Sequence, residues 1–218
     1  MSNFQFGTSK DTIQDTSGAP RMANPFLGKV KLAGLPEVRT IKAKDGTEYP
    51  NILAFTFKAQ PGETDVADNE VGGFLLEKLE WPPRDEDSQD KVSNKTGRIG
   101  YIMSKFLPEE DALIDPSQIK SWEHFIDTVI NRFEKNPDCL NNVVRIKAPA
   151  SEYKGKVDFD IPNYKGFIQA SKEDNPLAFS KKETAANNKW LATQSMEADN
   201  APDEDGVNLN FSDDDDLF

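Results

Sequence analysis

The sequence predicts a mainly β protein of the α+β class, with five antiparallel strands and a helix between the third and fourth strands. Alternation of apolar and polar residues marks the strands, because successive side chains of a strand point to opposite faces of a sheet. One long segment with apolar residues at helical spacing marks the helix. The 218 residues are enough for one domain with a hydrophobic core.

The first two strands form a predicted hairpin. The first strand covers residues 28–44 and is bent at Gly34-Leu35-Pro36, and Asp45-Gly46 is a strong signal for the turn that follows. The second strand covers residues 49–58 and ends before Pro61-Gly62. A bent first strand suits a barrel, in which one strand is shared around a corner.

Helices are expected after the third strand, which covers residues 73–81. Residues 84–96 are polar and without a pattern, so we expect a flexible insert there. Residues 98–107 have the spacing of a short helix. The clearest helix covers residues 116–135, with Asp115 as its predicted N-cap.

Two more strands are expected over residues 142–147 and 156–161, joined by a turn at residues 150–155. The resulting order of three strands, a helix and two strands is that of the OB-fold. We therefore expect a five-stranded antiparallel OB-like barrel over residues 26–171. A generic α+β sandwich is compatible with the same pattern.

Polar segments flank this barrel. Residues 1–25 predict a flexible arm, residues 172–196 a linker, and residues 197–218 a disordered acidic tail. The tail holds nine of the 38 acidic residues and no basic residue, which leaves 29 acidic against 26 basic residues in the rest of the chain. The near-neutral body can carry a basic face although the whole chain has a net charge of −12.

Several classes of protein are disfavoured by composition. Cys139 and His124 are the only cysteine and histidine, so we expect no internal disulfide, no zinc site and no other metal or cofactor. No phosphate-binding loop, nucleophile elbow or paired carboxylates stand out, so we do not expect an enzyme. The absence of a long apolar segment and of a signal-peptide pattern predicts a cytoplasmic protein without a membrane span.

The last residues of the tail are predicted to bind a partner protein. Four consecutive aspartates keep this segment solvated, yet an apolar pair follows them, and such a pair serves no core in a solvated peptide. It can fill a pocket whose basic rim receives the carboxylates. The predicted partner-binding residues are Asp213, Asp214, Asp215, Asp216, Leu217 and Phe218. A purely solubilising tail is the alternative.

A terminal Asp-Asp-Asp-Asp-Leu-Phe behind a linker and an OB-like core resembles the single-stranded DNA-binding proteins of bacteria and bacteriophages, the divergent phage members above all. The resemblance implies a protein that binds and protects single-stranded DNA in the cytoplasm of the bacterial host, during DNA replication, recombination and repair. It also implies that the tail recruits a polymerase, helicase or nuclease and competes with DNA for the groove. The chain lacks the Cys/His zinc module of some phage members.

Binding of single strands requires a basic groove with aromatic faces for base stacking. The basic candidates lie on the polar faces of predicted strands or beside turns: Lys29, Lys31, Arg39, Lys42, Lys44, Lys58, Arg145, Lys147, Lys154 and Lys156. The aromatic candidates are Tyr49, Trp81, Tyr101, Tyr153 and Tyr164, whereas Phe55, Phe57 and Phe159 share faces with aliphatic residues and are expected in the core. A solvated face explains any single lysine equally well, so only clustering on one side favours a binding site.

A second hypothesis assigns the chain to another class. It is a replication or transcription adaptor that docks on a clamp or polymerase through its tail and does not bind DNA itself. The sequence leaves the oligomeric state open.

Overall fold

The computed structural model describes residues 25–43, 45–64, 75–153, 156–164, 166–171 and 175–199. The side chains of residues 61–64, 153, 156 and 194–199 are outside this description. The predicted arm over residues 1–24 and the acidic tail from residue 200 onward therefore lie outside the described residues, as do Lys44 and Lys154.

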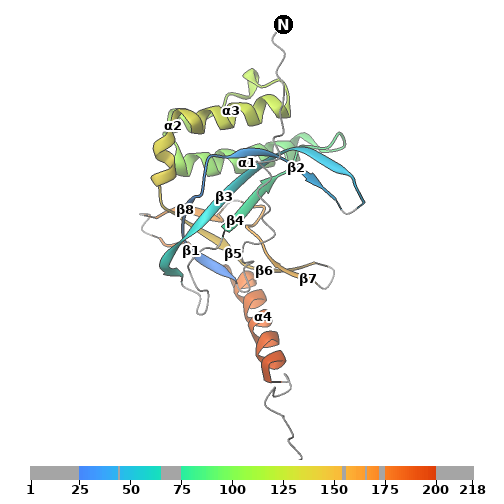
Figure 1. Ribbon diagram of the computed structural model, residues 1–218, viewed down its shortest axis with the longest axis vertical. Helices are drawn as coiled ribbons and strands as arrows, with labels where there is room; N and C mark the ends of the chain where they lie inside the picture. The colour runs from blue at the N-terminus through green and yellow to red at the C-terminus, as the bar shows by residue number, and fades with distance from the viewer. Residues whose placement is uncertain are drawn as a thin grey trace, which may run out of the picture.

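Six antiparallel strands form a sheet that curls into a half-barrel (Figure 1). They are β1 (Phe26–Leu32), β2 (Glu37–Lys42), β3 (Glu48–Thr64), β4 (Leu75–Glu80), β5 (Val144–Ala148) and β8 (Ile168–Ala170). Their order is β2-β3-β1-β5-β8, and β4 also pairs with β3. The predicted α+β class with a barrel-like antiparallel sheet is confirmed at this level.

The predicted bend at residues 34–36 divides the first strand into β1 and β2. β1 pairs with the second half of β3, and β2 pairs with its first half. The hairpin turn is confirmed, because Gly46 has a φ of 87° and the Ala43 N–H donates to the Thr47 carbonyl at 2.8 Å. The predicted end before Pro61 is wrong: β3 continues to Thr64, which pairs with Gly28 beyond a bulge in β3.

The polar segment over residues 84–96 is not the flexible insert that its composition predicts. It contains the first half of α1 (Gln89–Phe106), which begins at the N-cap Ser88. The predicted short helix over residues 98–107 is the second half of α1, whose apolar side chains are buried. Packing of that half stabilises the whole helix, so its polar half forms without an apolar face.

The long helix predicted over residues 116–135 is divided in two. Asp115 caps only a single 3₁₀ turn, η3 (Pro116–Gln118), and α3 (Trp122–Lys135) has Ser121 as its own N-cap. The hydroxyl oxygen of Ser121 accepts the His124 N–H at 3.2 Å. A shorter helix, α2 (Glu109–Ala112), precedes them, and η4 (Pro137–Asn141) follows α3.

The hydrophobic core lies between the sheet and the helices α1 and α3, which cover one of its faces (Figure 1). Phe55 and Phe57 of β3 are fully buried, as the sequence predicts. The Phe57 ring stacks on Phe106 of α1 at 6.1 Å, and Phe55 contacts Phe133 of α3 edge to face at 6.0 Å between ring centroids.

The C-terminal part of the body differs from the prediction. Residues 150–155 are expected to be a turn, but β6 (Ala150–Tyr153) and β7 (Lys156–Phe159) form a separate two-stranded sheet. Most of the predicted linker over residues 172–196 is helix α4 (Lys181–Asp199), which projects from the body away from α3 (Figure 1). No helix within the described residues has the length and apolar character needed to cross a membrane.

Side chains bridge the gap between β4 and the segment before β8. The ammonium group of Lys78, on β4, donates to the carbonyls of Ile161 and Pro162 at 3.1 and 3.2 Å and to the side-chain oxygen of Asn163 at 2.6 Å. Arg98 of α1 binds Glu80 at 2.7 Å and donates to the Asn163 carbonyl at 3.2 Å. These polar contacts, some of them buried, connect β4 and α1 to the segment before β8.

Candidate nucleic-acid interface

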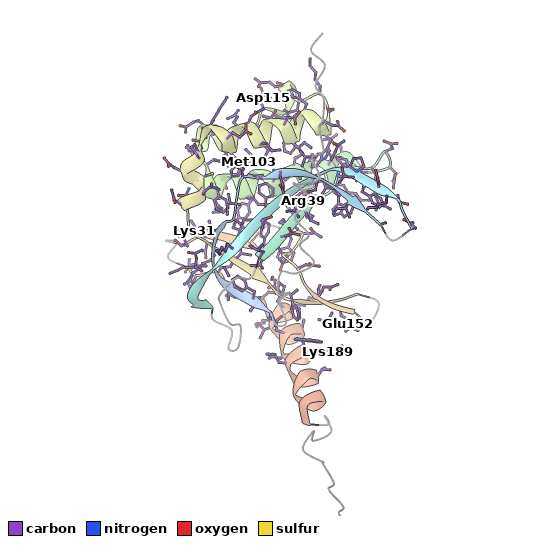
Figure 2. The ribbon with its side chains drawn as sticks, in the orientation of Figure 1. Lys31, Arg39, Met103, Asp115, Glu152 and Lys189 are labelled. Carbon is purple, nitrogen blue, oxygen red and sulfur yellow. The ribbon has the colours of Figure 1, made fainter. Side chains whose placement is uncertain are left out.

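Four of the predicted bases are neighbours on the outer face of the sheet, where they form what we call the basic strip: Lys58, Lys31, Lys29 and Arg145. Lys31 of β1 lies directly opposite Lys58 of β3, and Lys29 lies directly opposite Arg145 of β5. Lys29 and Lys31 are two positions apart on β1 and therefore share a face. Figure 2 labels Lys31 on this part of the sheet.

The register of the basic strip places like charges opposite each other, which costs stability. Directly opposed residues have Cβ atoms about 5 Å apart, and a like-charge pair there is destabilising by roughly 0.2–1 kcal/mol. Among the described residues, no carboxylate forms a salt bridge with Lys31, Lys58 or Arg145. An anionic ligand would reduce the repulsion between these opposed bases.

Arg39 and Lys42 do not join the basic strip, because carboxylates of the hairpin region bind them. Arg39 lies between Glu37 and Glu77, with nitrogen–oxygen distances of 2.6 and 2.5 Å, and also donates to the Thr56 hydroxyl. Lys42 pairs with Glu48 at 3.5 Å near the hairpin turn, with both side chains exposed. Neither residue is excluded from contact with a ligand, but each already has a counter-ion.

The prediction that Lys147 lines an exposed groove is wrong. Its side chain is only 7% exposed, and its ammonium group binds the Glu183 carboxylate of α4 at 2.9 Å and the Ala178 carbonyl at 3.2 Å. Glu183 also accepts hydrogen bonds from the Tyr164 hydroxyl and from the Ser180 N–H. Lys147 therefore anchors α4 to the outer face of β5.

Tyr49 and Trp81 form an exposed aromatic pair. Their rings meet edge to face with centroids 5.5 Å apart, and the two residues are 42% and 40% exposed. Trp81 directly follows β4, and Leu75 at the other end of that strand pairs with Lys58 of the basic strip. Six residues of strand separate the two features, which corresponds to roughly 20 Å.

The remaining aromatic candidates have other positions. Tyr101 packs against Phe167 of the core at 6.3 Å between ring centroids, and Tyr164 is bound to Glu183. Phe159 is half-buried against Trp190 of α4 rather than within the main core. The side chains of Tyr153 and Lys156 belong to the part of the chain that is not described, so their predicted role stays a prediction.

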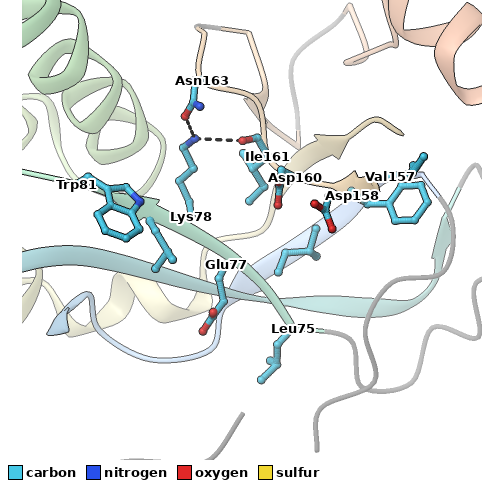
Figure 3. Close-up of a pocket in the computed structure, with 12 residues that line it drawn as sticks. Leu75, Glu77, Lys78, Trp81, Val157, Asp158, Asp160, Ile161 and Asn163 are labelled. Atoms are coloured by element: carbon cyan, nitrogen blue, oxygen red, sulfur yellow. Dashed lines mark hydrogen bonds between the residues drawn. The ribbon is translucent and has the colours of Figure 1, made fainter. Parts of the chain in front are cut away.

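Sequence reasoning missed an open cleft of about 740 Å³ between β4 and residues 157–163 (Figure 3). Its walls include Trp81 on one side and Asp158, Phe159 and Asp160 on the other. The alternation of acidic and apolar residues over 157–161 is visible in the sequence. Nothing in that alternation shows that these acids face β4, because the contact joins segments about 80 residues apart.

Comparisons of the chain with protein-family models, with curated proteins and with solved structures gave no match. Function is therefore inferred from the chain's own geometry.

Proposed function

We propose that this protein binds single-stranded DNA through the outer face of an OB-like half-barrel and does not catalyse a reaction. One observation carries the proposal: the strand register brings Lys58, Lys31, Lys29 and Arg145 together on one face. Clustering on one side is what separates a binding surface from scattered solvated lysines. The exposed pair of Tyr49 and Trp81 on the same sheet supplies aromatic faces on which bases stack.

The arrangement of elements supports an OB-like barrel as the framework. The helices between β4 and β5 occupy the position that the OB-fold gives to its helix, and a bent first strand pairs with both neighbours. In this framework the β2–β3 hairpin and the β6–β7 hairpin correspond to the two loops beside the groove. The outer faces of β3 and β4 form its floor.

Salt dependence of binding to a labelled oligothymidine tests the proposal. Four bases on phosphates give a slope of log K against log salt of about −3, at roughly 0.7 per contact, so a fourfold rise in salt weakens binding about 50-fold. The Lys31→Ala/Lys58→Ala variant should have half that slope and lose only about sevenfold. It should not be less stable, because it removes an opposed like-charge pair.

The matched control removes the same charge elsewhere. Lys91→Ala/Lys135→Ala takes two exposed bases from α1 and α3, away from the sheet. It should keep the slope of the unmodified protein. An equal loss of slope in both variants, or no binding at low salt, would contradict the proposed interface. The second outcome would favour the adaptor hypothesis, in which the body contacts protein only.

The acidic tail belongs to the same proposal. Its terminal Leu217 and Phe218 recruit a replication or recombination protein, and its aspartates are repelled by DNA. Removal of these two residues should abolish recruitment of a tail-binding polymerase, helicase or nuclease. Binding of the oligonucleotide should stay equal or become tighter. Loss of oligonucleotide binding on truncation would mean that the tail has another role.

A further inference from the structure

The cleft between β4 and residues 157–163 contains one open edge of the sheet (Figure 3). Within the described residues, β3 is the only strand that pairs with β4. The opposite edge of β4 therefore faces the cleft with backbone N–H and C=O groups that an added strand could pair with. Leu75 and Trp81, at the two ends of this edge, are 37% and 40% exposed.

Lys78 marks the inner limit of the cleft. Its ammonium group donates to the Ile161 and Pro162 carbonyls and to the side chain of Asn163, so its hydrogen-bond donors are used within the protein. The Lys78 side chain, and not backbone pairing between strands, thus connects β4 to residues 161–163. The accessible apolar side chains in the lining of the cleft are those of Leu75, Leu79 and Val157.

The far wall of the cleft carries two carboxylates. Asp158 and Asp160 line the cleft (Figure 3), and neither forms a salt bridge within the described residues. Glu77 on the β4 side is already bound to Arg39 at 2.5 Å. Burial, and next the charge of Asp158, raises the pKa of Asp160 above its usual value, against a smaller opposite effect of the Lys78 charge. A cation in the cleft would stabilise both carboxylates.

These features select among possible occupants. The acidic tail of this chain and a nucleic acid would both be repelled by Asp158 and Asp160. Residues 1–24 contain two basic and two acidic residues, so they have no charge that complements the cleft. A second copy of the chain would bring its own β4 edge together with its own carboxylates. A basic segment of another protein has the required charge.

We propose that the open edge of β4 accepts an extended basic segment of a partner protein as an additional antiparallel or parallel strand. Side chains of an added strand alternate between two faces, so apolar residues would lie on the accessible apolar lining while lysine or arginine residues reach Asp158 and Asp160. Backbone hydrogen bonds to β4 give affinity, and the two carboxylates select basic sequences. This site borders the proposed DNA-binding face at Trp81, which lines both, and it is separate from the basic strip and from the partner-binding tail.

Fluorescence anisotropy with the full chain and short labelled peptides tests the proposal. The probe alternates lysine and valine, and its controls are the glutamate–valine counterpart and a peptide with the same lysines and valines in two blocks. The alternating basic peptide should bind most tightly. The Asp158→Asn/Asp160→Asn variant should bind it roughly tenfold more weakly, as expected for the loss of two carboxylate–lysine pairs. Asp85→Asn/Glu86→Gln, which removes two exposed acids from the turn after β4, should change affinity less than twofold.

Backbone methylation shows whether the peptide binds as a strand. Two versions of the probe carry N-methyl groups on alternate residues, one set at odd and one at even positions. Only one set faces β4, so one version should lose binding and the other should retain it. Equal effects of the two sets, equal binding of the glutamate peptide, or no saturable binding up to about 1 mM would overturn the proposal.

Two further outcomes name other occupants. Sedimentation velocity of the protein alone detects self-association. If the chain self-associates and the Asp158→Asn/Asp160→Asn variant changes that equilibrium, the edge belongs to a second copy of the chain and the proposal is wrong. If the same variant weakens oligonucleotide binding tenfold, the cleft belongs to the nucleic-acid interface and the proposal is equally wrong. We expect the Asp158→Asn/Asp160→Asn variant to have the same oligomeric state as the unmodified protein. Its affinity for the oligonucleotide should be equal or higher.

Discussion

Substitution of Lys147 by methionine distinguishes a structural role of this residue, the anchoring of α4, from a role in DNA binding. Methionine retains the apolar stem but removes the ammonium group that binds Glu183 at 2.9 Å and the Ala178 carbonyl at 3.2 Å. The side chains of Lys147 and Glu183 are 7% and 10% exposed, so the remaining carboxylate would be buried without its cation. Breaking a buried pair in this way costs about 3 kcal/mol.

Urea denaturation of Lys147→Met, followed by circular dichroism, measures this cost. Lys189→Met is the matched control, because Lys189 also joins α4 to a carboxylate on a strand, that of Glu152 on β6 at 3.0 Å; both residues are labelled in Figure 2. That pair is 75% and 53% exposed, so its loss should cost between 0 and 1 kcal/mol. Hydrogen exchange of α4 should accelerate in the first variant only.

Comparison of the two variants tests whether burial makes the Lys147–Glu183 pair more stabilising than the exposed Lys189–Glu152 pair. Equal destabilisation, within about 0.5 kcal/mol, would refute the argument from burial. Oligonucleotide affinity provides the second criterion, since a structural Lys147 makes no contact with DNA and its loss should change affinity less than twofold in the folded protein. A fall in affinity and salt slope without a loss of stability would return Lys147 to the nucleic-acid interface.

Three other predictions concern α4, α3 and the aromatic pair. Burial alone would raise the pKa of Glu183, but hydrogen bonds from Tyr164, Ser180 and Lys147 outweigh it and lower the pKa from 4.5 to about 2. The contribution of Glu183 to the free energy of unfolding should therefore be complete above pH 4.5 and should fall by about 3 kcal/mol as the pH drops from 4.5 to 2. Urea titrations at each pH measure this change, and a pH-independent stability would contradict the hydrogen bonds assigned to Glu183. Ser121→Ala should cost about 1 kcal/mol in the same assay because α3 loses its N-cap acceptor, and an unchanged stability would mean that another residue caps the helix. Trp81→Ala should weaken oligonucleotide binding by about 1–3 kcal/mol with an unchanged salt slope, and equal affinity would place the aromatic pair outside the interface.

Local signals predicted much of the fold. Alternating residues located β1 to β5, Asp45-Gly46 located the hairpin, and Phe55 and Phe57 were correctly placed in the core. These features depend on neighbours in the chain, because a strand repeats every two residues and a turn needs a residue that accepts a positive φ. The same signals also identified Lys29, Lys31, Lys58 and Arg145 as residues on the polar faces of strands.

Local signals failed where distant contacts stabilise a segment. The polar first half of α1 and most of α4 lack the apolar stripe that predicts a helix. α1 forms because its second half is buried, and α4 is held by Lys147 and by Asn187, whose side-chain oxygen accepts the Ala150 N–H at 2.8 Å. Those partners lie 36 and 37 residues away, beyond the reach of any window of sequence.

The sequence by itself determined which side chains point outward from each strand and that the acidic charge is concentrated at the end of the chain. Only the tertiary structure decided which outward bases become neighbours. The register of β1 against β3 and β5 joined four of them into the basic strip, while packing of α4 gave Lys147 a carboxylate partner. The reason is physical: the direction of a side chain follows from the local backbone, but its neighbours follow from the packing of segments far apart in the chain.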